Sequence, residues 1–124
     1  MYKIPNISIP PMIPLEELAI ENNGWCLEEI AGPHGNVAMK CERSLIFGRS
    51  ARNCNVVFPT DTKGVSGVHC EVVPMKDGLL LKDLNSTYGT FLIDGRRVEP
   101  NHGVMLERGD VFYLASKEVM FKVV

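Results

Sequence analysis

The sequence predicts an all-β protein, an antiparallel β-sandwich over residues 25–124, and three observations lead to this prediction. Short apolar runs recur at regular intervals along this part of the chain. Glycine, proline, asparagine and aspartate, which favour turns, separate these runs. After Trp25, no long stretch has apolar residues at helical spacing. Many short strands with turn signals between them are typical of a sandwich or a barrel.

The first half of this domain is expected to hold five strands. They lie where apolar and β-branched residues gather, at residues 25–30, 37–41, 45–47, 55–58 and 69–73. Residues 32–36 contain two glycines and a proline, so they form the first turn. A turn at Gly48-Arg49 and a polar loop at residues 59–64 separate the later strands.

The second half continues the same pattern. We expect strands at residues 79–82, 90–93, 97–98, 104–106, 111–114 and 119–124. Asp94-Gly95 stands between apolar runs and is a strong hairpin signal, because both residues tolerate a positive φ. The last strand reaches the final residue, and we therefore expect the domain to belong to a longer chain.

Residues 1–24 have a different composition and are expected to form a tail or a linker. Pro5, Pro10, Pro11 and Pro14 interrupt regular structure, and residues 14–20 have room for a turn or two of helix. A docking role and packing on the chain's own domain remain as alternatives.

Composition narrows the functional classes. The formal net charge is −2 and the pI is about 5.9, which argues against a nucleic-acid binder. The sequence contains no apolar run of about 18 residues for a membrane span and no signal peptide, so we expect a cytoplasmic protein. The four cysteines are singly spaced, which favours free thiols over a zinc site formed with His69, and we expect no metal and no cofactor.

Residues 79–95 combine a strand, a polar loop, a second strand and a tight turn. The loop, Asp83-Leu84-Asn85-Ser86-Thr87-Tyr88-Gly89-Thr90, offers hydroxyls and backbone N–H groups to an anion. It resembles the signature loop of forkhead-associated (FHA) domains. Phe47-Gly48-Arg49-Ser50 resembles the Gly-Arg turn of that family, and Val65-Ser66-Gly67-Val68-His69 resembles its Ser-x-x-His segment. The three segments occur in the family's order, and the resemblance extends over residues 25–124.

The resemblance implies a site for a phosphorylated peptide. Arg49 suits phosphate because its planar donors engage two oxygens and its charge does not titrate. The hydroxyl and the N–H of Ser66 can both donate, and Thr87 matches a position that contacts the phosphate or the peptide. Without the resemblance, Arg49 at a strand end and Ser66 closing a turn would be ordinary surface residues. Further expected contacts are Ser86, Tyr88, Arg52 and Lys63, and the expected structural supports are Gly48, His69 and Gly89.

Two positions depart from the family pattern. Tyr88 replaces a common asparagine that hydrogen-bonds the backbone of the ligand, and a tyrosine lacks that amide. Gly67 stands where the family often has arginine, so one positive charge is missing; Arg52 and Lys63 are candidates to compensate for it.

Ser66 and His69 also raise the possibility of a hydrolytic pair, for which Asp83 is the candidate orienting carboxylate. A triad needs an oxyanion hole as well, and nothing in the sequence supplies one. We therefore expect a non-enzymatic module that binds phosphothreonine in a partner protein, a substrate of a Ser/Thr kinase, as part of a signalling or secretion-linked protein. The alternative is a degenerate scaffold of the same fold that binds an unphosphorylated partner or self-associates.

Overall fold

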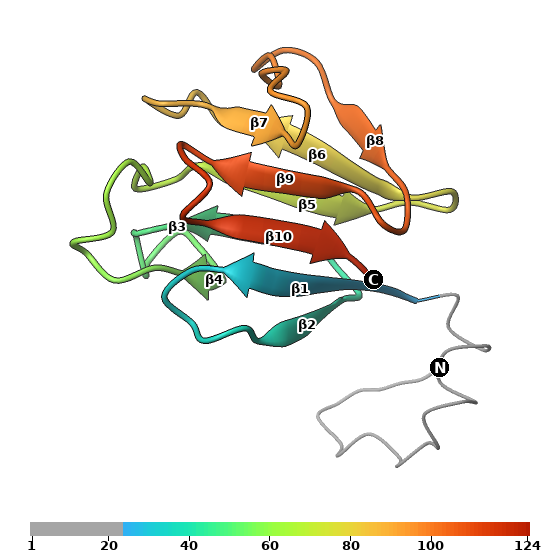
Figure 1. Ribbon diagram of the computed structural model, residues 1–124, viewed down its shortest axis with the longest axis horizontal. Helices are drawn as coiled ribbons and strands as arrows, with labels where there is room; N and C mark the ends of the chain where they lie inside the picture. Colours follow the sequence, from blue (N-terminus) through green and yellow to red (C-terminus); the bar gives the residue numbers. More distant parts are fainter. Residues whose placement is uncertain (1–23) are drawn as a thin grey trace.

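Two five-stranded β-sheets pack face to face in the computed structural model, which describes residues 24–124 (Figure 1). The first sheet consists, in spatial order, of β2 (Ala38–Cys41), β1 (Trp25–Ala31), β10 (Met120–Val123), β9 (Val111–Leu114) and β7 (Thr90–Leu92). The second consists of β4 (Val56–Val57), β3 (Leu45–Gly48), β5 (Cys70–Pro74), β6 (Leu79–Asp83) and β8 (Val104–Leu106). The predicted all-β sandwich is confirmed, whereas the predictions for the tail lie outside the described residues.

One pair of strands is parallel, which the prediction of an antiparallel sandwich did not include. β3 and β4 run in the same direction, with Phe47 opposite Val56. Asn55, just before β4, bonds to β3 through its backbone as well as its side chain, and its backbone N–H donates to the Ile46 carbonyl at 3.0 Å. Its Oδ1 accepts from the Ile46 N–H at 2.6 Å, and its Nδ2 donates to the Ser44 carbonyl at 3.0 Å.

Four other expected strands are shorter than predicted. β2 begins at Ala38 rather than Val37, β7 ends at Leu92 rather than Ile93, and β10 begins at Met120 rather than Val119. Residues 97–98 form an isolated bridge, Arg97 with Phe91, and the Val98 N–H donates to the Thr90 carbonyl at 2.8 Å. The last strand ends at Val123 rather than Val124. The Asp94-Gly95 hairpin forms as expected, although only Gly95 takes a positive φ, of 94°.

The core joins the two sheets through aromatic rings. Phe47 of the second sheet packs edge-on against Phe112 and Phe121 of the first, with ring centroids 6.2 and 5.1 Å apart. Phe58, which follows β4, packs against Phe121 at 6.3 Å. All four rings are buried. Edge-to-face pairs of this kind stabilise the packing beyond the burial of apolar area.

The loops carrying the sequence motifs lie at one end of the sandwich. The loop after β3, the loop before β5 and the loop after β6 are at the left of Figure 1, and the C-terminus is at the opposite end. No helix of the described residues has the length and apolar character needed to cross a membrane.

Candidate functional site

A cavity of about 260 Å³ opens where these loops meet. Its lining includes Arg49 from the first loop, Thr60, Asp61 and Ser66 from the second, and Thr87 and Tyr88 from the third. Arg49, Ser66 and Thr87, the three residues expected to contact phosphate, therefore face one cavity although they are far apart in the sequence.

Backbone hydrogen bonds hold the Arg49 loop against the Ser66 loop. The Arg49 N–H donates to the Ser66 carbonyl at 3.0 Å, and the Ser50 N–H donates to the Gly67 carbonyl at 2.9 Å. A Cβ on Gly48 would lie 2.2 Å from the Gly67 carbonyl oxygen. Gly48 is thus required by the close approach of two backbones. Gly67 is different, because a Cβ there would meet nothing within 4 Å.

Backbone carbonyls orient the Arg49 guanidinium. Its Nε donates to the Val65 carbonyl, and its Nη1 donates to the Thr60 carbonyl at 3.1 Å. Among the ion pairs of residues 24–124, none involves Arg49. The guanidinium is therefore held in place while its charge and its remaining N–H groups stay available to an anion.

His69 supports the site from beneath and is fully buried. Its Nδ1 accepts from the Ser66 N–H at 3.0 Å, so its Nε2 carries the proton and donates to the Gly89 carbonyl at 2.9 Å. Burial lowers the pKa of His69 and favours this neutral form. Both ring nitrogens are used by the backbone, and the Ser66 hydroxyl accepts instead from the Thr87 N–H at 3.0 Å. Ser66 and His69 thus do not form a nucleophile–base pair.

Asp83 organises the signature loop. Its Oδ1 accepts from the hydroxyls of Ser86 and Thr90, each at 2.6 Å, and its Oδ2 accepts from the Ser86 N–H at 3.1 Å. The Ser86 hydroxyl in turn accepts from the Gly89 N–H at 3.0 Å. Ser86 is buried, its polar groups bond within the loop, and it is not among the residues that line the cavity. The spacing of Asp83 and Ser86, a carboxylate three residues before an N–H donor, is a local turn signal that could have indicated this role.

The backbone conformation of the signature loop explains why glycine and asparagine occur at positions 89 and 85. Gly89 has a φ of 95°, and a Cβ there would lie 2.9 Å from Arg97 Nε. Asn85 also takes a positive φ, of 60°, which asparagine tolerates better than most residues. The positive φ and the close approach of Arg97 both favour glycine at position 89.

The remaining expected contacts lie at or beyond the rim. The Tyr88 side chain is 64% exposed, so it is not a core residue. Arg52 and Lys63 are exposed in the neighbouring loops, and neither lines the cavity. Within residues 59–64 the sequence analysis named only Lys63 as a candidate contact, and it missed Thr60 and Asp61.

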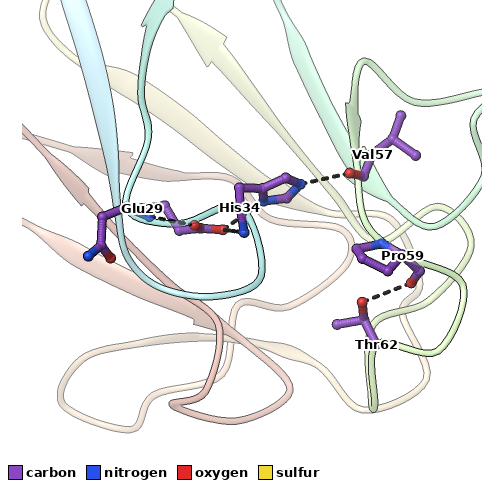
Figure 2. Close-up of polar contacts among 6 residues, drawn as sticks. Glu29, His34, Val57, Pro59 and Thr62 are labelled. Atoms are coloured by element: carbon purple, nitrogen blue, oxygen red, sulfur yellow. Dashed lines mark hydrogen bonds and ion pairs between the residues drawn. The ribbon is translucent and has the colours of Figure 1, made fainter.

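A buried carboxylate of the first sheet, Glu29, supports the loop of residues 59–64 through His34 (Figure 2). Glu29 of β1 has no exposed surface, and it accepts from His34 Nδ1 at 2.7 Å and from the Asn36 N–H at 3.1 Å. His34 Nε2 lies 2.7 Å from the Val57 carbonyl, two residues before Pro59. The Thr62 hydroxyl donates to the Pro59 carbonyl at 2.8 Å and closes the turn that carries Thr60 and Asp61.

Nδ1 of His34 faces the Glu29 carboxylate and Nε2 faces the Val57 carbonyl, so both ring nitrogens face acceptors. Forming both hydrogen bonds therefore requires two protons on the His34–Glu29 pair, one for each bond. Burial lowers the pKa of His34, but its bonds to Val57 and Glu29 and the charge of Glu29 outweigh this effect, so the pKa is raised. The sequence analysis predicted only a turn at residues 32–36, because it cannot show that His34 reaches β4.

Residues 24–124 contain no cluster of three or more histidine, cysteine, aspartate or glutamate side chains suited to a metal ion. The four cysteines are free thiols, with Cys41 and Cys70 buried. Burial raises the pKa of Cys41 to about 11, so this thiol is protonated at neutral pH.

Comparison with known proteins agrees with the loop motifs. The FHA domain family model matches residues 45–115, which include all three motif segments. The chain belongs to the FHA domain family. No curated protein matches it by sequence.

Solved structures show the same fold. The FHA domain of the CT664 protein from Chlamydia trachomatis superimposes with a TM-score of 0.69 at 21% identity, covering 82% of this chain and 96% of that one. An FHA domain from a study of phosphothreonine-dependent interactions gives 0.64 at 28% identity, covering 81% and 94%. The FhaA FHA domain, complexed with the intracellular domain of Rv3910, gives 0.63 at 27% identity, covering 81% and 99%.

Proposed function

We propose that this chain is a non-catalytic module that binds phosphothreonine in partner proteins phosphorylated by Ser/Thr kinases, within a larger signalling or secretion-linked protein. The observation that carries the proposal is the convergence of Arg49, Ser66 and Thr87 on one cavity. The three residues come from three loops that the backbone bonds hold together.

The chemistry of the cavity suits a phosphate group. A phosphorylated threonine carries a charge of about −1.5 to −2 at pH 7 and three acceptor oxygens. Arg49 supplies a permanent positive charge, and the hydroxyls of Ser66 and Thr87 supply further donors. A carboxylate has one charge and two oxygens, and should bind much more weakly.

The choice of threonine rests on the relatives. The FHA domain at 28% identity comes from a study of phosphothreonine-dependent interactions, and the one at 27% identity was solved with a domain of another protein. Both support the inference that this site takes a phosphothreonine segment of a protein partner. The structural role of His69 supports a module without catalysis.

A degenerate scaffold is the second candidate, and two observations favour it. With glycine at position 67, Arg49 is the one cation among the described residues that line the cavity, and Tyr88 is exposed where the family commonly has an amide. Such a module would bind an unphosphorylated partner or a second copy of itself.

Binding to a phosphothreonine peptide library and to its unphosphorylated counterpart separates the two candidates. We expect the wild-type protein to bind phosphothreonine peptides, to bind phosphoserine versions much more weakly, and to leave unphosphorylated peptides unbound in fluorescence polarisation or calorimetry. Arg49→Ala should weaken binding by roughly ten- to a hundredfold, since a charge-assisted hydrogen bond contributes about 1.5–3 kcal/mol.

Arg43→Ala is the matched control, because Arg43 is exposed before β3 at the opposite end of that strand from Arg49. It should bind as the wild type does, and both variants should melt cooperatively. Equal binding of phosphorylated and unphosphorylated peptides, or full affinity in Arg49→Ala, would favour the scaffold instead.

A further inference from the structure

The cavity lined by the proposed phosphate contacts is also lined by an acidic group that phosphate binding does not require. Asp61 lines the same cavity as Arg49, and among the described residues that line it these are the only two charged side chains. A lone carboxylate repels a phosphate dianion. The carboxylate therefore opposes the proposed ligand unless the ligand also brings a positive charge.

The backbone holds Asp61 at this place. The Thr62 N–H and hydroxyl both donate to the Pro59 carbonyl, at 3.0 and 2.8 Å, so residues 59–62 form a closed turn with Thr60 and Asp61 at its centre. The bond from Arg49 Nη1 to the Thr60 carbonyl ties this turn to the arginine. Within residues 24–124, Asp61 takes part in no ion pair, and its side chain is exposed.

Tyr88 supplies an aromatic surface on the same cavity. Its ring is 64% exposed, while its two neighbours are fixed: the Thr87 N–H donates to the Ser66 hydroxyl, and the Gly89 N–H donates to the Ser86 hydroxyl. The ring is thus presented to solvent from a rigid backbone. An exposed tyrosine face attracts a cation, and a guanidinium can stack on the ring and pair with a carboxylate at the same time.

We propose that Asp61 and Tyr88 select phosphothreonine peptides that carry an arginine, or less favourably a lysine, close to the phosphothreonine. The proposal rests on the phosphothreonine function and adds the class of partner, which is a protein phosphorylated at a basic site. Such a ligand matches the cavity charge for charge, with its phosphate at Arg49 and its basic side chain at Asp61.

The test is a positional scan on one phosphothreonine peptide. Each position near the phosphothreonine carries arginine, alanine or glutamate in turn, and fluorescence polarisation gives each affinity. At one position or more, arginine should bind roughly three- to thirtyfold more tightly than alanine, the effect expected of an exposed ion pair combined with a cation–π contact. Glutamate at the same position should bind more weakly than alanine.

Two variants assign the preference to its residues. Asp61→Asn should lose most of the difference between arginine and glutamate, and its affinity for the alanine peptide should rise because a repelling charge is gone. Tyr88→Ala should retain the discrimination against glutamate and lose part of the arginine advantage. Asp77→Asn is the matched control, because Asp77 is an exposed aspartate in the β5–β6 turn at the opposite end of the sandwich, and it should keep the full preference.

The outcomes distinguish the basic-site proposal from the phosphothreonine function on which it rests. If the alanine phosphopeptide binds better than its unphosphorylated form but arginine and glutamate peptides bind alike, the basic-site proposal is wrong and the phosphothreonine function stands. Full preference in Asp61→Asn would also overturn it. If no phosphopeptide binds, both proposals fail.

Discussion

The Glu29–His34 pair makes the stability of the domain depend on pH, and Glu29→Gln should remove this dependence. In the wild type, the pKa of His34 is raised by its bonds to the Val57 carbonyl and Glu29 and by the Glu29 charge, against the opposing effect of burial. A raised folded pKa means that the extra stability is fully present below the unfolded pKa of about 6.5. It is lost as the pH rises through the folded pKa.

The size of the effect follows from the contacts. Deprotonation removes one charge-assisted hydrogen bond, which contributes about 1.5–3 kcal/mol. Because the His34 side chain is 24% exposed and Glu29 is fully buried, we expect the lower half of that range. A domain of this size changes its melting temperature by about 4–8 °C per kcal/mol, so the wild type should lose roughly 6–18 °C between pH 6 and pH 9.

The variant retains the shape of the site without its charge. A glutamine at position 29 can donate to Nδ1 of a neutral His34, while Nε2–H still donates to the Val57 carbonyl. The variant should therefore be less stable than the wild type at pH 6 and lose little more by pH 9.

Thermal unfolding at closely spaced pH values is the measurement, and NMR titration of the His34 ring gives its pKa directly. His69 has a pKa lowered by burial, so its contribution is lost as the pH falls below about 6.5. It is common to both proteins and cancels in their difference. Parallel melting curves for wild type and Glu29→Gln from pH 6 to pH 9 would refute this reasoning.

Three further predictions concern the motif glycines and the tail. Gly48→Ala places a Cβ 2.2 Å from the Gly67 carbonyl oxygen, so it should cost about 1–3 kcal/mol of stability and weaken peptide binding. The control is Gly67→Ala, whose Cβ meets nothing within 4 Å. In the same melting and binding assays, this control should change neither the stability nor the affinity. Gly67→Arg adds a second cation beside the cavity and should tighten phosphopeptide binding by up to about tenfold, with a larger effect at low salt. If Gly67→Arg binds no more tightly than Gly67→Ala, the new side chain turns into solvent and the prediction is wrong. Deleting residues 1–22 should leave a cooperatively folding domain, since the strands of the described part of the chain pair and pack with one another within residues 25–123, and loss of the melting transition would contradict this.

Much of the fold follows from the sequence because strands and turns have local causes. Alternating apolar residues mark β5, a short apolar run marks β6, and the Asp94-Gly95 dipeptide marks its hairpin wherever it stands in the fold. The sequence analysis did not predict that β3 and β4 pair in parallel, or that the Asn55 side chain bonds to the Ile46 N–H and the Ser44 carbonyl. Both features depend on which strands lie side by side, and local sequence does not carry this information.

For the candidate site, the sequence by itself determined which motifs are present, in which order, and that Arg49, Ser66 and Thr87 have the chemistry of phosphate contacts. It also determined the need for glycine at position 89, where the loop takes a positive φ. Only the tertiary structure decided that Ser86 faces inward to Asp83, that Asp61 shares a cavity with Arg49, and that His34 joins β1 to β4. A motif can be identified from the sequence because it is defined by residue types and their spacing along the chain. Burial, charge pairing and cavity walls depend on segments distant in the sequence, which meet only when the two sheets pack.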